Sequence, residues 1–162
     1  MVCAALLGVL TGCSPGHNAT VAVGYDPTGR LIAAAKVCHH SVAEAELVQT
    51  GPKSDSTVGT WERSSPLEYL ETWSLLGRTE GPWTFEGREL DDLDQKARYQ
   101  LSLWSADHGW GNHLEFTGRD LAHLVPGEVL VERVRQGEPG SPLTTTLEII
   151  TLDQLADENC SE

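Results

Sequence analysis

Histidine and aspartate side chains in the second half of the chain are the first candidates for chemistry. His108 and His113 flank a DHGWGN segment that begins at Asp107, and these three side chains could converge on a metal ion if the chain reverses there. The adjacent His39 and His40 would point to opposite faces of a strand. None of these spacings matches a recognised metal-ligand motif. A polar loop in water explains the same residues, so no metal site or cofactor is predicted.

Other catalytic patterns are absent or incomplete. The chain contains neither a GxSxG elbow nor an HExxH motif, although a catalytic triad can also assemble from distant residues. The segment Asp91-Asp92-Leu93-Asp94 is acidic enough for calcium but lacks the Gly and the terminal Glu of an EF-hand loop. A solvated acidic loop is the better interpretation, and the sequence favours a protein that binds over one that catalyses.

Trp110 is the residue that most suggests a binding surface, because it lies between two glycines at the tip of a predicted hairpin. An exposed aromatic ring is poorly solvated unless it folds back or meets a partner. Trp110, with His108 and His113, therefore forms a candidate contact site for a ligand or partner. The alternative is that Trp110 folds back onto Trp104 or Phe116.

An apolar run from Val2 to Leu10 opens the chain and stops shortly before Cys13. The run has the length of a signal-peptide core and is too short to span a bilayer. The tetrapeptide LTGC at 10–13 resembles the bacterial lipobox. The resemblance implies that residues 1–12 are a signal peptide, that Cys13 is lipidated by a diacylglycerol thioether, and that residues 13–18 form a tether. Only a thiolate is nucleophilic enough for that transfer near neutral pH.

One feature of the start departs from the lipobox pattern. The first basic residue is Arg30, whereas a signal peptide carries Lys or Arg ahead of its apolar run. A start assigned too far downstream, or a truncation, would account for the difference. The alternative is a buried N-terminal strand with an ordinary thiol. With the anchor, the chain is expected on the extracytoplasmic face of the cell membrane.

The four cysteines fit an exported protein. Cys3 would leave with the signal peptide and Cys13 would be acylated, so that Cys38 and Cys160 remain as an even pair in an oxidising compartment. A disulfide between them would close a long loop and contribute about 4–5 kcal/mol in the chain-entropy model. Two buried free thiols are the alternative. A zinc site is less well supported, because neither cysteine has a CxxC or HxxxH neighbour.

Charge and composition exclude some partners. The chain has 162 residues and a formal net charge of −13, with 24 acidic against 11 basic residues. A phosphate backbone needs Lys and Arg to displace its counterions, so nucleic acid is not expected as a partner. An apolar content of 40% is that of a globular chain, and residues 19–162 are expected to form a single domain.

Turn chemistry and alternation predict many short strands. Residues 19–25 and 31–38 form a predicted hairpin around the turn Asp26-Pro27-Thr28-Gly29, which has Pro at its second position and Gly where positive φ is needed. The strand at 31–38 is almost entirely apolar, which predicts cover on both faces. Residues 51–59 are expected to be a polar loop. Further strands are expected at 43–50, around Trp61, Trp73 and Trp83, and at 99–103, 113–117, 128–134 and 143–150.

The end of the chain has a helical pattern. Thr151 and Gln154 fit a capping box, and Leu152, Leu155, Ala156 and Cys160 share one helical face. That face would point the Cys160 thiol toward the sheet. One helical turn is also expected within 118–125. The predicted fold is an all-β antiparallel sandwich of about eight or nine strands with a short C-terminal helix.

Two stretches, GYDPTGRLIAAAKVC and LEFTGRDLAHLVPGEVLVERV, together resemble small cell-envelope lipoproteins of actinobacteria. In that family a hairpin ending in Cys opens the mature domain, a D-L-x-x-L-x-P-G-x-V-L-V segment follows, and a terminal helix ends near a Cys. The resemblance implies an envelope location and a structural role for the turn residues Asp120, Leu121, Leu124, Pro126 and Gly127. It implies no activity and no catalytic residue.

Three functions are compatible with these observations. The first is a non-enzymatic, lipid-anchored binding or interaction module of the cell envelope that contacts an envelope protein or a small ligand. The second is an envelope hydrolase or metal-dependent enzyme that uses Asp107, His108 and His113. The third is a prophage-encoded lipoprotein that excludes infecting phage.

Overall fold

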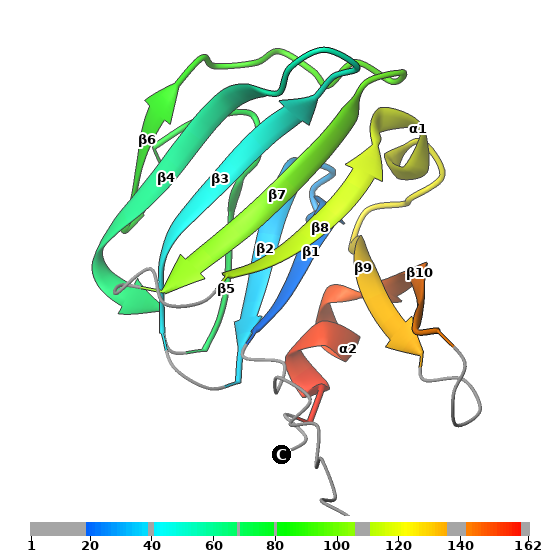
Figure 1. Cartoon of the computed structure of the whole chain (residues 1–162). Coiled ribbons are helices and arrows are strands. Elements are labelled where there is room, and N and C mark those ends of the chain that lie inside the picture. Colours follow the sequence, from blue (N-terminus) through cyan, green and yellow to red (C-terminus); the bar gives the residue numbers. More distant parts are fainter. Residues whose placement is uncertain are drawn as a thin grey trace, which may run out of the picture.

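A computed structural model describes residues 19–38, 41–67, 69–79, 81–105, 111–135 and 142–159. Within them the chain forms ten strands and two short helices (Figure 1). The strands are β1 (Ala19–Tyr25), β2 (Leu31–Val37), β3 (Val42–Thr50), β4 (Ser56–Leu67), β5 (Leu70–Ser74), β6 (Trp83–Gly87), β7 (Arg98–Ser105), β8 (Gly111–Thr117), β9 (Glu128–Arg135) and β10 (Thr144–Thr151). The helices are α1 (Gly118–Leu121) and α2 (Leu152–Asp157).

The strands form two five-stranded antiparallel sheets that pack face to face. The first sheet has the order β10-β9-β1-β2-β5 and the second the order β6-β4-β3-β7-β8. This confirms the predicted all-β sandwich with a short C-terminal helix. The described residues contain ten strands against the eight or nine expected, and Trp61, Trp73 and Trp83 lie on β4, β5 and β6. The expected polar loop is also shorter, because β4 already begins at Ser56.

The core between the sheets is built from alternate residues of the strands. Val21 and Val23 of β1 and Ala33 and Ala35 of β2 point inward with Leu101 and Leu103 of β7, and all are buried. Trp61, Trp73 and Trp83 are also fully buried and belong to this core. The rings of Trp73 and Trp83, on strands of different sheets, lie 4.5 Å apart between centroids.

An ion pair joins the two sheets beside this aromatic cluster. Arg63 of β4 pairs with Glu71 of β5, and its guanidinium lies 5.3 Å from the ring centroid of Trp83. Burial lowers the pKa of Arg63. The pair links the second sheet to the edge strand of the first.

Helix α2 covers the outer face of the first sheet. Thr151 and Gln154 form the predicted capping box, in which the backbone amide of Gln154 donates to Thr151 Oγ1 at 3.1 Å. Leu155 is fully buried against a second apolar cluster that includes Ala22 and Ala34. Strand β2 is therefore buried on both faces, as its apolar sequence predicts.

The other predicted local elements also form. Strands β7 and β8 pair as a hairpin from Arg98↔Thr117 to Trp104↔Gly111, and α1 provides the expected helical turn. The tip of that hairpin, 106–110, lies outside the described residues. Among the residues that the structure describes, no helix has the length and apolar character needed to cross a bilayer.

Candidate functional site

Most of the residues singled out from the sequence lie outside the described ranges. They are Cys13, His39, His40, Asp107, His108, Trp110 and Cys160, so their predicted roles stay predictions. His113 lies on β8 and is exposed, and Cys38 directly follows β2. Across the described ranges no group of three or more His, Cys, Asp or Glu side chains is placed to hold a metal ion.

Cys38 and His113 line the same cavity, of about 270 Å³, at the end of the sandwich where β1 begins. We call it the amino-end cavity. Ala19, Thr20 and Val21 contribute one wall, and Glu158 and Asn159, which follow α2, contribute another. Residues far apart in sequence thus meet at this end of the molecule.

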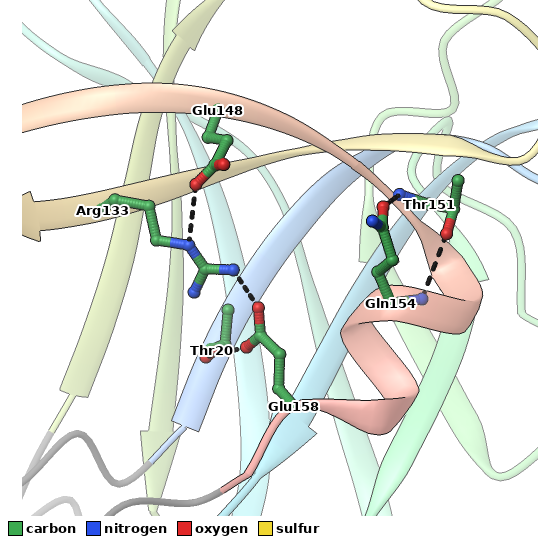
Figure 2. Close-up of polar contacts among 6 residues, drawn as sticks. All are labelled: Thr20, Arg133, Glu148, Thr151, Gln154 and Glu158. Atoms are coloured by element: carbon green, nitrogen blue, oxygen red, sulfur yellow. Dashed lines mark hydrogen bonds and ion pairs between the residues drawn. The ribbon is translucent and has the colours of Figure 1, made fainter.

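A polar network ties the walls of the amino-end cavity together (Figure 2). Arg133 of β9 pairs with Glu158, and its Nε lies 3.3 Å from an oxygen of Glu148 on β10. Thr20 Oγ1 donates to the other oxygen of Glu158 at 3.4 Å. The hydrogen bond to Glu158 is the main cause that raises the pKa of Arg133, with burial opposing it. Because these carboxylates already accept from Arg133, the network serves chiefly to hold α2 against the first sheet.

A second cavity, of about 340 Å³, lies at the opposite end of β1. We call it the distal cavity. Its walls include the side chains of Tyr25, Arg30, Ser74, Arg78 and Asp92, and its apolar part comes from Leu31, Ile32 and Leu76. A seven-residue strand is about 20 Å long, so β1 separates the two cavities by roughly that length.

The turn between β1 and β2 builds one wall of the distal cavity. Asp26 Oδ1 accepts from the amides of Thr28 and Arg30 at 2.8 and 3.0 Å and from the Thr28 hydroxyl at 2.6 Å. Its other oxygen accepts from Arg30 Nε at 2.7 Å. Gly29 closes the turn with φ +83°, as expected from its position. The Asp26 carboxylate therefore holds both the turn and the guanidinium of Arg30 in place.

These contacts shift the acidity of Asp26. The hydrogen bond from the Thr28 hydroxyl, with those from Arg30 and the turn amides, holds the pKa of the Asp26 carboxyl well below its usual range, against the opposing effect of burial. The side chain is about one-tenth exposed. Asp26 is thus ionised throughout the physiological pH range and acts as a structural acceptor.

The opposite wall follows β5 and the acidic segment at 91–94. Leu75 N donates to Leu31 O at 3.3 Å, and Leu90 N donates to Leu76 O at 2.9 Å. These backbone bonds bring Ser74 and Asp92 to the same rim. Asp92 Oδ1 accepts from the amide of Leu93 at 2.8 Å, and Leu93 itself is buried in the core.

The distal cavity combines an apolar floor with side chains of both charges and two hydroxyl groups. Ligand sites in proteins are commonly concave and apolar, with a few polar groups that fix orientation. This arrangement suits noncovalent binding of a small polar molecule or of a side chain from a partner protein. The sequence predicts only the turn from Asp26 to Gly29 beside this site. The rest was missed because Tyr25, Ser74, Arg78 and Asp92 are brought together only by sheet pairing.

Comparison with protein-family models, with curated protein sequences and with solved structures gave no match for this chain. The functional argument therefore rests on the sequence and on the geometry of the described residues.

Proposed function

We propose that the protein is a lipid-anchored, extracytoplasmic binding module of the bacterial cell envelope. The observation that carries the proposal is the position of the distal cavity. Residue 19 directly follows the predicted tether at 13–18, and the distal cavity lies at the other end of β1. An anchor at Cys13 would hold the amino-end cavity toward the membrane and leave the distal cavity facing outward.

The expected contact role of His113 changes in this arrangement. Asn112, at the start of β8, donates through Nδ2 to the carbonyl of Ala19, so β8 begins beside the point where the tether enters. Contacts made by His113 would therefore be made near the membrane. A partner in the envelope would meet the distal cavity instead.

The disulfide between Cys38 and Cys160 belongs to the same proposal. Asn159, the residue before Cys160, lines the amino-end cavity together with Cys38. A bond here would add a covalent link to the polar network that already holds the end of α2.

Intact mass spectrometry of the native membrane fraction tests both covalent features. We expect an N-terminal Cys13 bearing a diacylglycerol group and a mass lower by two hydrogen atoms than that of the same chain with reduced thiols. A Cys13→Ser variant should move to the soluble fraction. Unmodified protein in the cytosol with both remaining thiols reduced would contradict the anchor and the disulfide together.

A thermal-shift screen of small acidic, basic and neutral molecules tests the distal cavity. A compound that binds there should raise the melting temperature of the wild-type protein, and the shift should disappear in Arg78→Ala. Arg119→Ala is the matched control, because Arg119 is also exposed but lines neither cavity. Shifts that survive Arg78→Ala unchanged would place binding elsewhere and contradict the proposed site.

A further inference from the structure

Strand β10 is the longest edge strand of the sandwich among the described residues. It lies outermost in the first sheet and pairs with β9 from Thr144↔Arg135 to Thr151↔Glu128 without a register shift. The edge strands β5 and β6 have only five residues each. Edge strand β8 lies close to β1 and β9 of the other sheet. An unpaired edge presents a row of backbone donors and acceptors to which another strand can bind.

The sequence of β10 lacks the usual protection of an edge strand. Natural edges carry Lys, Pro or a bulge that discourages pairing, but β10 reads TTTLEIIT and has none of these. Six of its eight residues are β-branched, which favours the extended conformation. Its one charge, Glu148, is paired with Arg133 of the neighbouring strand. The edge is therefore regular and open to pairing.

One face of β10 is apolar and partly exposed. Leu147 and Ile149 are 41% and 48% exposed. Ile149 lies opposite Leu130 of β9, a buried residue of the core between the sheets, so Ile149 points to the same side as that core. Val134 of β9 lies on this side too and is 42% exposed. The apolar surface thus continues the core outward, past the region that the second sheet covers.

Acidic side chains lie on both faces of the sheet beside β10. Glu132 of β9 lies directly opposite Leu147, on the face of the apolar stripe. Asp153 and Asp157 belong to α2, which covers the other face. The whole chain carries a net charge of −13. A partner that binds here gains from basic side chains and from apolar side chains at alternate positions, because neighbours along a strand face opposite sides.

We propose that β10 is a docking edge for an extended segment of a partner protein in which apolar and basic residues alternate. The segment adds a sixth strand to the first sheet. Its apolar side chains extend the stripe of Leu147 and Ile149, and its basic side chains lie beside Thr146 and Glu148 on the other face. A second copy of the chain fits less well, because it would bring another body of charge −13 against the first.

The probe for this proposal is a heptapeptide with blocked ends that alternates lysine and valine, beginning and ending with lysine. Two controls are a peptide of the same composition with its lysines and valines in separate blocks, and an alternating peptide with N-methyl groups on every second amide. We expect saturable binding of the alternating peptide by calorimetry. The block peptide and the N-methylated peptide should bind at least about tenfold more weakly, because strand addition needs both the alternation and the backbone donors.

Substitutions in β10 complete the test. The double variant Leu147→Thr, Ile149→Thr removes the apolar stripe, keeps β-branched residues and adds no charge. It should weaken binding of the alternating peptide by about tenfold, since two half-buried aliphatic contacts are lost. Val125→Thr is the matched control, because Val125 is 56% exposed and lies outside β10. It should bind as the wild type does.

Three results would overturn the proposal. Equal binding of the block peptide would mean that charge alone attracts the probe, and equal binding of the N-methylated peptide would exclude strand addition. A dimer in sedimentation experiments that the double variant abolishes would make a second copy the occupant. Because the peptide controls use the unaltered protein, they decide the question even if the double variant fails to fold.

Discussion

Replacement of Asp26 offers the sharpest test of the physical account of the β1–β2 turn. Four donors converge on this one carboxylate, two from backbone amides and two from the side chains of Thr28 and Arg30. Asp26→Asn keeps one oxygen acceptor but removes the charge and the acceptor for Arg30 Nε. Asp26→Ala removes every acceptor.

The expected loss of stability follows from the strength of these bonds. A hydrogen bond to a charged group contributes about 1.5–3 kcal/mol net, and bonds that share one acceptor are not additive. We therefore expect the free energy of unfolding to fall by about 2 kcal/mol in Asp26→Asn and by about 3 kcal/mol in Asp26→Ala. For a domain of this size the latter corresponds to a fall in melting temperature of roughly 6–12 °C.

The pH dependence has a definite sign. Since the folded-state pKa of Asp26 is depressed, the stabilisation from its carboxylate is complete above the unfolded-state pKa of about 3.9. It is lost as the pH falls below that value toward the folded-state pKa, because only the unfolded chain then takes up a proton. The difference in stability between wild type and Asp26→Asn should be constant from pH 5 to pH 7 and should narrow below about pH 4.

Urea denaturation at several pH values measures this difference. Asp55→Asn is the matched control, because Asp55 is an exposed turn carboxylate whose single bond accepts from the Gly51 amide at 3.2 Å. It should change stability by less than about 0.5 kcal/mol. If Asp26→Asn is as stable as wild type at pH 7, or if the difference is the same at pH 3, the turn does not depend on the ionised carboxylate.

Two further substitutions test the packing of the first sheet. Leu155→Ala leaves a cavity between α2 and the sheet and should lower the free energy of unfolding, measured by urea denaturation, by about 3 kcal/mol. Leu152→Ala should lower it clearly less, because the Leu152 side chain is only half-buried. Equal losses in the two variants would mean that α2 is not anchored through Leu155. Gly24→Ala places a Cβ only 2.2 Å from the carbonyl oxygen of Glu128 and forces β1 away from β9. The free energy of unfolding should fall by about 3 kcal/mol. A variant as stable as the wild type would show that the two strands can move apart without loss of stability.

Local chemistry in the sequence predicted a large part of this fold. The turn from Asp26 to Gly29 could be assigned because Pro and Gly fix φ at defined positions. Cover on both faces of β2 followed from its apolar composition. The helix after Thr151 could be predicted because a capping box depends only on residues three apart.

Other features depend on which strands pair, and local patterns do not determine this. The segments around Trp61, Trp73 and Trp83 could be expected as strands, but their pairing partners β3, β2 and β4 could not be predicted from spacing. The distal cavity unites Tyr25 with Asp92 through the pairing of β2 with β5. The ion pair between Arg63 and Glu71, which joins the two sheets, likewise could not be predicted from the spacing of the two residues in the sequence.

The position of β1 also has a mechanical consequence. β1 lies in the middle of the first sheet and is bonded to β2 on one side and β9 on the other. Tension applied through residue 19 would pull along the strand, so that hydrogen bonds perpendicular to it resist shear together. In single-molecule stretching, unfolding by a pull on residue 19 should therefore require more force than unfolding by a pull on residue 151. A pull on residue 151 would separate β10 from β9 one hydrogen bond at a time. A tether joined to residue 19 would therefore pull on a strand that is bonded on both sides.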